Sequence, residues 1–381
     1  MSLKERLGLQ NSHTPTSDRV TSYGIGRNPF PSASQTSGHQ RLVDSTDEEI
    51  EKRLRDFLSN YTSQVVVIEG TQGTGKSNLL QFYEKELPTL DEGDGGVFVV
   101  HYYPDPEPAL DKLLAHMIQD LGPEYLESVV KKLKAATTAE AEKATSQIRG
   151  PEFRQMVRRL RQKPDADLAE ACALAIEWLR GLRIFKKHTL ILGVYQRLDT
   201  TESRIGAVRD LLVVSEAIGR LRALFLLLDE LEKQEDVSRS NIHVVRYLAS
   251  LRALIDALPR RFFLVLAITP SARDTYRRYY PALASRLEGS VIRLKGIETL
   301  DLARSLYDFY LEAERNRMKE SEADHFPKKL KEPLTPKEIE ELYKSASFDV
   351  QRTAGRLTPR LWLQKLHERF AEFFDTTTAA A

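Results

Sequence analysis

The sequence predicts an α/β fold with a mainly parallel sheet of five strands, and two observations support this prediction. Short apolar runs occur five times, and the first four are almost continuously apolar, as strands covered on both faces are. Stretches of helical periodicity separate the runs, which favours parallel strands joined by right-handed crossovers. The expected strands are Val65–Glu69, Val97–Tyr103, Ala223–Asp229, Phe262–Thr269 and Val291–Leu294.

Three regions follow from the composition along the chain. Residues 1–43 are expected to form an extended arm, because residues 11–38 are rich in Ser, Thr, Pro, Gly and Asn. Within it, the Pro-flanked Phe30 is placed to pin the arm to the core. Residues 44–296 contain all five strands, with a helical insertion over about 122–219 between the second and third strands. Residues 297–381 show only helical periodicity and predict a helical lid.

Composition excludes several classes of protein. The net charge of +1 over 381 residues gives no field that would attract nucleic acid or a membrane as a whole. The single cysteine, Cys172, excludes an internal disulfide and a multi-cysteine metal site. No apolar run approaches the about 20 residues that span a bilayer, and the N-terminus has no apolar signal core. We therefore expect a cytoplasmic protein without membrane contacts.

A glycine-rich motif follows the first expected strand and precedes a helical run. It matches the pattern G-x-x-x-x-G-K-[ST], in which backbone N–H groups and a helix N-terminus surround phosphates. Lys76 is expected to reach the β- and γ-phosphates of ATP, and the Ser77 hydroxyl to bind Mg²⁺. The expected nucleotide-binding residues are Gly70, Thr71, Gln72, Gly73, Thr74, Gly75, Lys76, Ser77 and Asn78.

Two carboxylates end the third strand, which is otherwise fully apolar. A carboxylate in such a place is costly without a cation or hydrogen-bond donors. Asp229 is suited to the Mg²⁺ shell, and Glu230 to the general base that polarises the attacking water. The alternative is a strand end closed by ordinary solvated acids.

Two further polar residues have a catalytic and a structural interpretation each. Thr269 stands where the fourth strand ends and can hold the attacking water, or it simply closes the strand before Pro270. Arg360 lies in the first turn of the last helix of the lid, where it can respond to the γ-phosphate or be a solvated arginine.

A basic stretch lies within the expected insertion, at residues 149–163. Arg154, Arg158 and Arg161 fall on one helical face, which predicts contact with a phosphate backbone or, alternatively, an ordinary solvated face.

As an ordered set, these motifs resemble the AAA+ superfamily. The most similar groups are the initiator and transposition-regulator ATPases and the ATP-binding proteins of BREX-type phage-defence systems. The resemblance covers about 44–296 and 297–374, and the segment 219–232 especially resembles the BREX group. The motifs that carry the resemblance are GTQGTGKS, GRLRALFLLLDELE, the strand ending in Thr269, ALASRL and GRLTPRLWL.

The resemblance implies a strand order of 5-1-4-3-2 and roles for individual residues. Lys76 and Ser77 take phosphate and magnesium, Asp229 and Glu230 take magnesium and water, and Thr269 is the polar sensor. Arg286 resembles an arginine finger offered to a neighbouring subunit, or is a surface arginine, and Arg360 resembles the lid sensor. Two departures are the long insertion and the expected absence of the winged-helix domain of replication initiators.

The main functional hypothesis is an ATP-hydrolysing AAA+ protein that forms homo-oligomers and acts on DNA or a partner protein. The first alternative is a monomeric signal-transduction NTPase with slow hydrolysis, in which Arg286 folds back on its own lid. A second alternative is a DNA-binding adaptor that uses the basic helix, with ATP setting only its oligomeric state.

Overall fold

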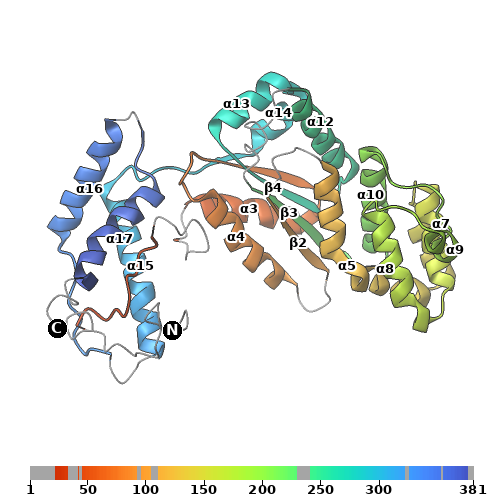
Figure 1. The fold of residues 1–381 in the computed structure, drawn as a ribbon, viewed down its shortest axis with the longest axis horizontal. Coiled ribbons are helices and arrows are strands. Elements are labelled where there is room, and N and C mark those ends of the chain that lie inside the picture. The colour runs from red at the N-terminus through yellow and green to blue at the C-terminus, as the bar shows by residue number, and fades with distance from the viewer. Residues whose placement is uncertain are drawn as a thin grey trace, which may run out of the picture. The chain divides into compact units, whose positions relative to one another are not determined.

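The computed structural model describes residues 22–32, 42, 45–91, 96–103, 110–229, 241–321, 326–352 and 355–375. At its centre is a five-stranded sheet in the order β2-β3-β4-β1-β5 (Figure 1). Every pairing is parallel, so the predicted fold class and the implied order 5-1-4-3-2 are confirmed. The strands are β1 (Gln64–Glu69), β2 (Val97–Tyr102), β3 (Ala223–Leu228), β4 (Phe262–Ile268) and β5 (Val291–Arg293).

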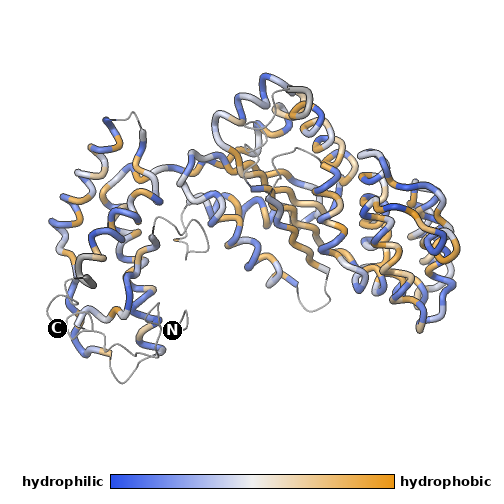
Figure 2. Tube along the Cα trace, viewed as in Figure 1, coloured by the Kyte–Doolittle hydropathy of each residue, from blue (hydrophilic) through white to orange (hydrophobic). Residues whose placement is uncertain are grey.

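The central strands β3 and β4 are buried on both faces, and their alternate residues enter two separate cores. In β4, Phe262 and Leu264 join one core while Phe263 and Val265 join the other. A period of two is therefore present although the sequence is continuously apolar. Figure 2 shows these strands in the hydrophobic colour along their length.

The chain forms two compact units. The sheet unit comprises Val43–Thr71 and Lys76–Leu294, and the C-terminal unit comprises Met1–Leu42, Gln72–Gly75 and Lys295–Ala381. The helices that flank the sheet are α3 (Ser45–Asn60), α4 (Lys76–Glu86), α12 (Asn241–Ala257), α13 (Pro270–Tyr279) and α14 (Pro281–Leu287), with 3₁₀ turns η1 (Leu87–Leu90) and η3 (Glu288–Ser290).

Helices fill the sequence between β2 and β3. They are α5 (Leu110–Ala135), α6 (Thr138–Ser146), α7 (Pro151–Gln162), η2 (Asp165–Asp167), α8 (Leu168–Leu179), α9 (Lys186–Leu192) and α10 (Thr201–Ala217). The helix α5 is kinked at Gly122, where φ is +74° and Pro123 follows. Cys172 is fully buried in α8, and burial raises the pKa of its thiol to about 12, so it is packed and unreactive.

The C-terminal unit combines α15 (Leu300–Ser321), α16 (Pro336–Gln351) and α17 (Pro359–Asp375) with residues 22–32 of the arm. Phe30 is 2 % exposed, and its ring centroid lies 4.8 Å from that of Phe370 and 5.7 Å from that of Tyr307. Arg27 also pairs with Glu314 at 3.0 Å. Phe30 therefore pins the arm to the core of this helical unit. No helix in the described ranges is both long and apolar enough to cross a membrane.

Candidate nucleotide site

The glycine-rich loop connects β1 to α4, as the sequence predicts for a phosphate-binding loop. Gly73 and Gly75 have φ angles of +83° and +96°, in the left-handed region that side chains rarely adopt. A Cβ atom at Gly75 would meet no heavy atom within 4 Å, so there is open space beside the backbone here. Thr74, between the two glycines, is buried, whereas Thr71 and Gln72 are exposed.

Lys76 opens α4 and is only 8 % exposed. Its Nζ donates to the carbonyl oxygen of Gly70 at 2.8 Å and to that of Thr71 at 3.4 Å. The ammonium group is thus held at the first residues of the loop. Ser77 and Asn78 follow in the first turn of α4 and are half-buried, close to the positive end of the helix dipole.

The carboxyl ends of β3, β4 and β1 lie side by side because these strands are neighbours in the parallel sheet. Asp229, the residue after β3, is fully buried, and its backbone N–H donates to the carbonyl oxygen of Tyr102 at 3.1 Å. Thr269 follows β4, and Gly70 follows β1. The topology brings these three predicted residues to one edge of the sheet. Glu230, the expected base, lies outside the described residues.

Thr269 caps helix α13. Its Oγ1 accepts the backbone N–H of Ala272 at 3.2 Å and lies 3.0 Å from the Ser271 hydroxyl oxygen. The strand-closing interpretation is therefore seen directly. A hydroxyl that accepts a capping hydrogen bond keeps one proton to donate, so the capping role leaves a water-holding role open.

Glu69 is a charged residue at this edge that the sequence analysis did not select. It ends β1, directly before the loop, and is 5 % exposed. One carboxylate oxygen lies 3.0 Å from Nε of Arg293 and the other 2.8 Å from Nη1 of Arg273. The rule that singled out Asp229, a carboxylate at the end of a buried strand, applies equally to Glu69.

The two predicted arginines have different surroundings. The guanidinium of Arg286, in α14, is 46 % exposed and pairs with Asp256 of α12. Asp256 also lies 3.6 Å from Arg252, so Arg286 shares its acidic partner. Arg286 therefore keeps a solvent-accessible guanidinium within the sheet unit.

Arg360 lies in the first turn of α17 and contacts the glycine-rich loop within the C-terminal unit. Its backbone N–H donates to the carbonyl oxygen of Gly73 at 3.2 Å. A Cβ atom at Gly73 would lie 3.2 Å from the Cβ of Arg360 and 3.1 Å from Oγ1 of Thr358. A side chain at position 73 would therefore strain the backbone and also crowd Thr358 and Arg360. The sequence pointed to the Arg360 side chain, whereas it is the backbone that makes this contact.

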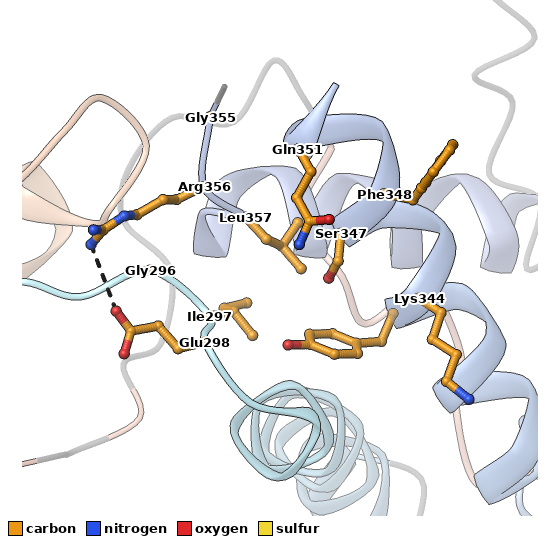
Figure 3. Close-up of a pocket in the computed structure, with 11 residues that line it drawn as sticks. Gly296, Ile297, Glu298, Lys344, Ser347, Phe348, Gln351, Gly355, Arg356 and Leu357 are labelled. Carbon is orange, nitrogen blue, oxygen red and sulfur yellow. Dashed lines mark ion pairs between the residues drawn. The ribbon is translucent and has the colours of Figure 1, made fainter. Parts of the chain in front are cut away.

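The C-terminal unit also contains an open pocket of about 520 Å³ that no sequence motif predicted. In Figure 3, Gln351 and Ser347 point to the same side of α16 as Leu357, while Phe348 points away from it. Glu298 and Arg356 form an ion pair of 3.7 Å on one side. The pocket is lined by Gly296, Ile297, Glu298, Tyr343, Lys344, Ser347, Phe348, Gln351, Gly355, Arg356 and Leu357.

The sheet order, the β1–loop–α4 arrangement and the helical C-terminal unit together define an AAA+-type P-loop protein. The sequence model of the BREX system ATP-binding protein BrxC/D family matches residues 103–371, and the chain belongs to that family. The predicted resemblance to BREX ATP-binding proteins is thereby confirmed. The matched residues begin after the glycine-rich loop, so the match and the loop are separate observations.

Solved structures of the ORC2 protein of Aeropyrum pernix are similar to this chain. The structure with ADPNP and ADP is 16 % identical, covers 89 % of this chain and 72 % of its own, and has a TM-score of 0.42. The ADP form is 14 % identical, covers 89 % and 73 %, and has a TM-score of 0.40. Among curated proteins, nothing matches.

Proposed function

We propose that this BREX-family protein binds ATP with Mg²⁺ at residues 70–78 and hydrolyses it, as an oligomeric motor or switch on DNA or a partner protein. The observation that carries the proposal is the loop itself. It combines left-handed glycines, open space beside Gly75 and a buried Lys76 at the start of a helix. This combination suits a bound polyphosphate because it brings a cation and a helix N-terminus to the same loop.

Each predicted residue has a role in this proposal. Lys76 pairs with the β- and γ-phosphates, and Ser77 and Asp229 hold the magnesium ion, which neutralises phosphate charge when bound. Glu230 accepts a proton from water as the water oxygen bonds to the γ-phosphorus. The bond to the bridging oxygen breaks, giving ADP and inorganic phosphate.

The remaining polar residues support that step. Thr269 orients the water through its hydroxyl, and Arg286 of one subunit stabilises charge at the site of the next. Arg360 links nucleotide state to the C-terminal helices, which its backbone contact with Gly73 supports.

Two variants test the proposal. Lys76→Ala is expected to abolish ATP binding, because the loop loses its buried cation, whereas Glu230→Gln keeps ATP bound but loses turnover because an amide accepts no proton. Binding is measured by fluorescence of a labelled ATP analogue and turnover by phosphate release. Lys85→Ala, which changes an exposed lysine of the same helix, is the matched control. Normal ATP affinity in Lys76→Ala would refute the proposal.

A second candidate function is a monomeric switch with slow hydrolysis. The pairing of Arg286 with Asp256 inside its own sheet unit favours it, since a finger held by an internal acid is less available to a neighbour. The two functions differ in whether Arg286 acts on another subunit. Mixing Arg286→Ala protein with Lys76→Ala protein and measuring hydrolysis separates them.

A further inference from the structure

Exposed apolar side chains are concentrated around the short helix α9. Among the residues that the structure describes, eight large apolar residues are exposed. Four of these eight fall within residues 182–195. Tyr195 is 73 % exposed, Leu190 67 %, Phe185 54 % and Leu182 42 %. Such a concentration on a soluble surface marks a contact site more often than chance placement.

The same region carries cations without acidic partners. Arg158 and Arg159 of α7 are exposed, and α7 packs against α9 (Figure 1). Lys186, the first residue of α9, is exposed, and so is Arg183 in the segment that precedes the helix. Over the ranges that the structure describes, none of these four side chains has an ion-pair partner. We call Arg158, Arg159, Arg183, Phe185, Lys186, Leu190 and Tyr195 the α9 surface.

Glu152, the single acid of α7, does not neutralise this surface. Its carboxylate accepts the backbone N–H groups of Tyr195 at 3.0 Å and of Gln196 at 2.9 Å. From the other side, Nε1 of Trp178 donates to the carbonyl oxygen of Gln196 at 2.9 Å. The turn after α9 is therefore anchored twice, so that it presents the Tyr195 ring to solvent on a fixed backbone.

The aromatic and basic groups are also close to one another. The Arg183 guanidinium lies over the Phe185 ring, 5.8 Å from its centroid. Gly193, which ends α9 with a φ of +71°, allows close approach of Arg159, whose Nε would lie 3.4 Å from a Cβ atom there. Arg183 thus lies against the Phe185 ring, and Arg159 lies beside Gly193, two residues before Tyr195.

We propose that the α9 surface binds single-stranded nucleic acid. Arg158, Arg159 and Lys186 contact successive phosphates, and unpaired bases stack on Phe185 and Tyr195. Lysine is depleted from protein–protein interfaces, whereas here Lys186 directly follows an exposed ring, so a polyanion fits better than a protein partner. A duplex is a poorer ligand because its base faces are covered.

This inference rests on the proposed function, because it names nucleic acid as what the ATPase acts on. Binding of nucleic acid to the α9 surface does not itself require ATP. It uses a different set of cations from the predicted face. The Arg154 guanidinium donates to the carbonyl oxygen of Ile148 and Arg161 is half-buried, whereas Arg158 and Arg159 are both exposed.

The test measures fluorescence anisotropy of a labelled 30-nucleotide oligothymidylate with the full chain. Phe185→Ala and Tyr195→Ala are each expected to weaken binding about tenfold, the loss of one stacked base. Arg158→Gln combined with Arg159→Gln should lower the salt-dependence slope by about 1.4, or 0.7 per lost phosphate contact. Phe348→Ala, at 61 % exposure, and Lys337→Gln, at 85 %, are matched controls expected to bind as the parent does.

Several outcomes would overturn the inference. Oligothymidylate affinity unchanged in Phe185→Ala, Tyr195→Ala and the Arg158→Gln/Arg159→Gln double variant would remove the α9 surface from binding, and equal affinity for a duplex would remove base stacking. Self-association abolished by Tyr195→Ala, with no oligonucleotide binding, would assign the surface to a protein contact. Lys76→Ala should bind oligonucleotide normally. Oligonucleotide binding without ATP binding in the parent would therefore refute the proposed ATPase alone, and ATP hydrolysis without oligonucleotide binding would refute this inference alone.

Discussion

At the scale of single residues, Glu69 shows how a buried carboxylate is accommodated at the end of a strand. Removing a carboxylate from water costs several kcal/mol unless charges or donors replace the water. Two guanidiniums do so here, from α13 and from the end of β5. The three charges tie together β1, β5 and α13 immediately before the glycine-rich loop, so they fix the position from which the loop starts.

Glu69→Gln is expected to destabilise the sheet unit by about 1–3 kcal/mol. The amide keeps the shape but leaves two arginines without their negative charge, and the loss is moderated because Arg273 and Arg293 are 29 % and 64 % exposed. The free energy of unfolding in urea measures it. Arg293→Gln, which removes the more exposed partner, should cost less. An unchanged urea midpoint for Glu69→Gln would show that the ion pairs contribute nothing net.

At the scale of elements, the arm is joined to α15 by charge as well as by packing. Glu314 of α15 is 4 % exposed and contacts Arg27 of the arm and Arg317. Burial acts to raise the pKa of Glu314, but hydrogen bonds from Arg317 and Arg27 outweigh it and hold the pKa below its ordinary value of 4.5. The folded state therefore favours the ionised carboxylate.

The pH dependence follows from that direction. Because the folded pKa is depressed, the unfolded chain binds more protons in acid, so this contribution to stability is present above about pH 4.5 and lost as the pH falls through the folded pKa. Glu314→Gln is expected to lose stability at neutral pH and to show a smaller further loss between about pH 5 and about pH 3. Thermal melting at both pH values, with Glu320→Gln as an exposed control on α15, measures it. Parallel pH profiles for parent and variant would contradict the assignment.

At the scale of the whole molecule, the open question is assembly. Arg286→Ala is expected to leave ATP affinity nearly intact and to lower hydrolysis by about 10³-fold if the arginine serves a neighbour. Mixed with Lys76→Ala protein, it should recover activity, because one subunit keeps a competent loop and the other keeps the arginine. Phosphate release from the mixture measures the recovery. Mixed oligomers that form but stay inactive would show that Arg286 does not act on a neighbouring subunit.

The sheet was predictable because its central strands are short apolar runs followed by a polar residue, as Asp229 follows β3. The strand order came only from the resemblance, since apolar runs do not say which strands pair. The ion pairs of Glu69 join residues more than 200 positions apart, and no local pattern marks them. Helical spacing predicted a basic face within residues 149–163, but it could not show that the Arg154 guanidinium donates to the carbonyl oxygen of Ile148.

The position of Phe30 has a consequence for the order of biosynthesis. Phe30 packs against Phe370, which leaves the ribosome some 340 residues later. At about 5–20 residues per second, this interval is on the order of tens of seconds. All strands of the sheet have been synthesised by Arg293, so the sheet unit can fold during translation. Phe30 and Ile25 stay unpacked until the C-terminal helices that bury them have been synthesised. A nascent chain stalled before α17 would therefore expose this apolar arm to chaperones and proteases, and release of the full chain would withdraw it.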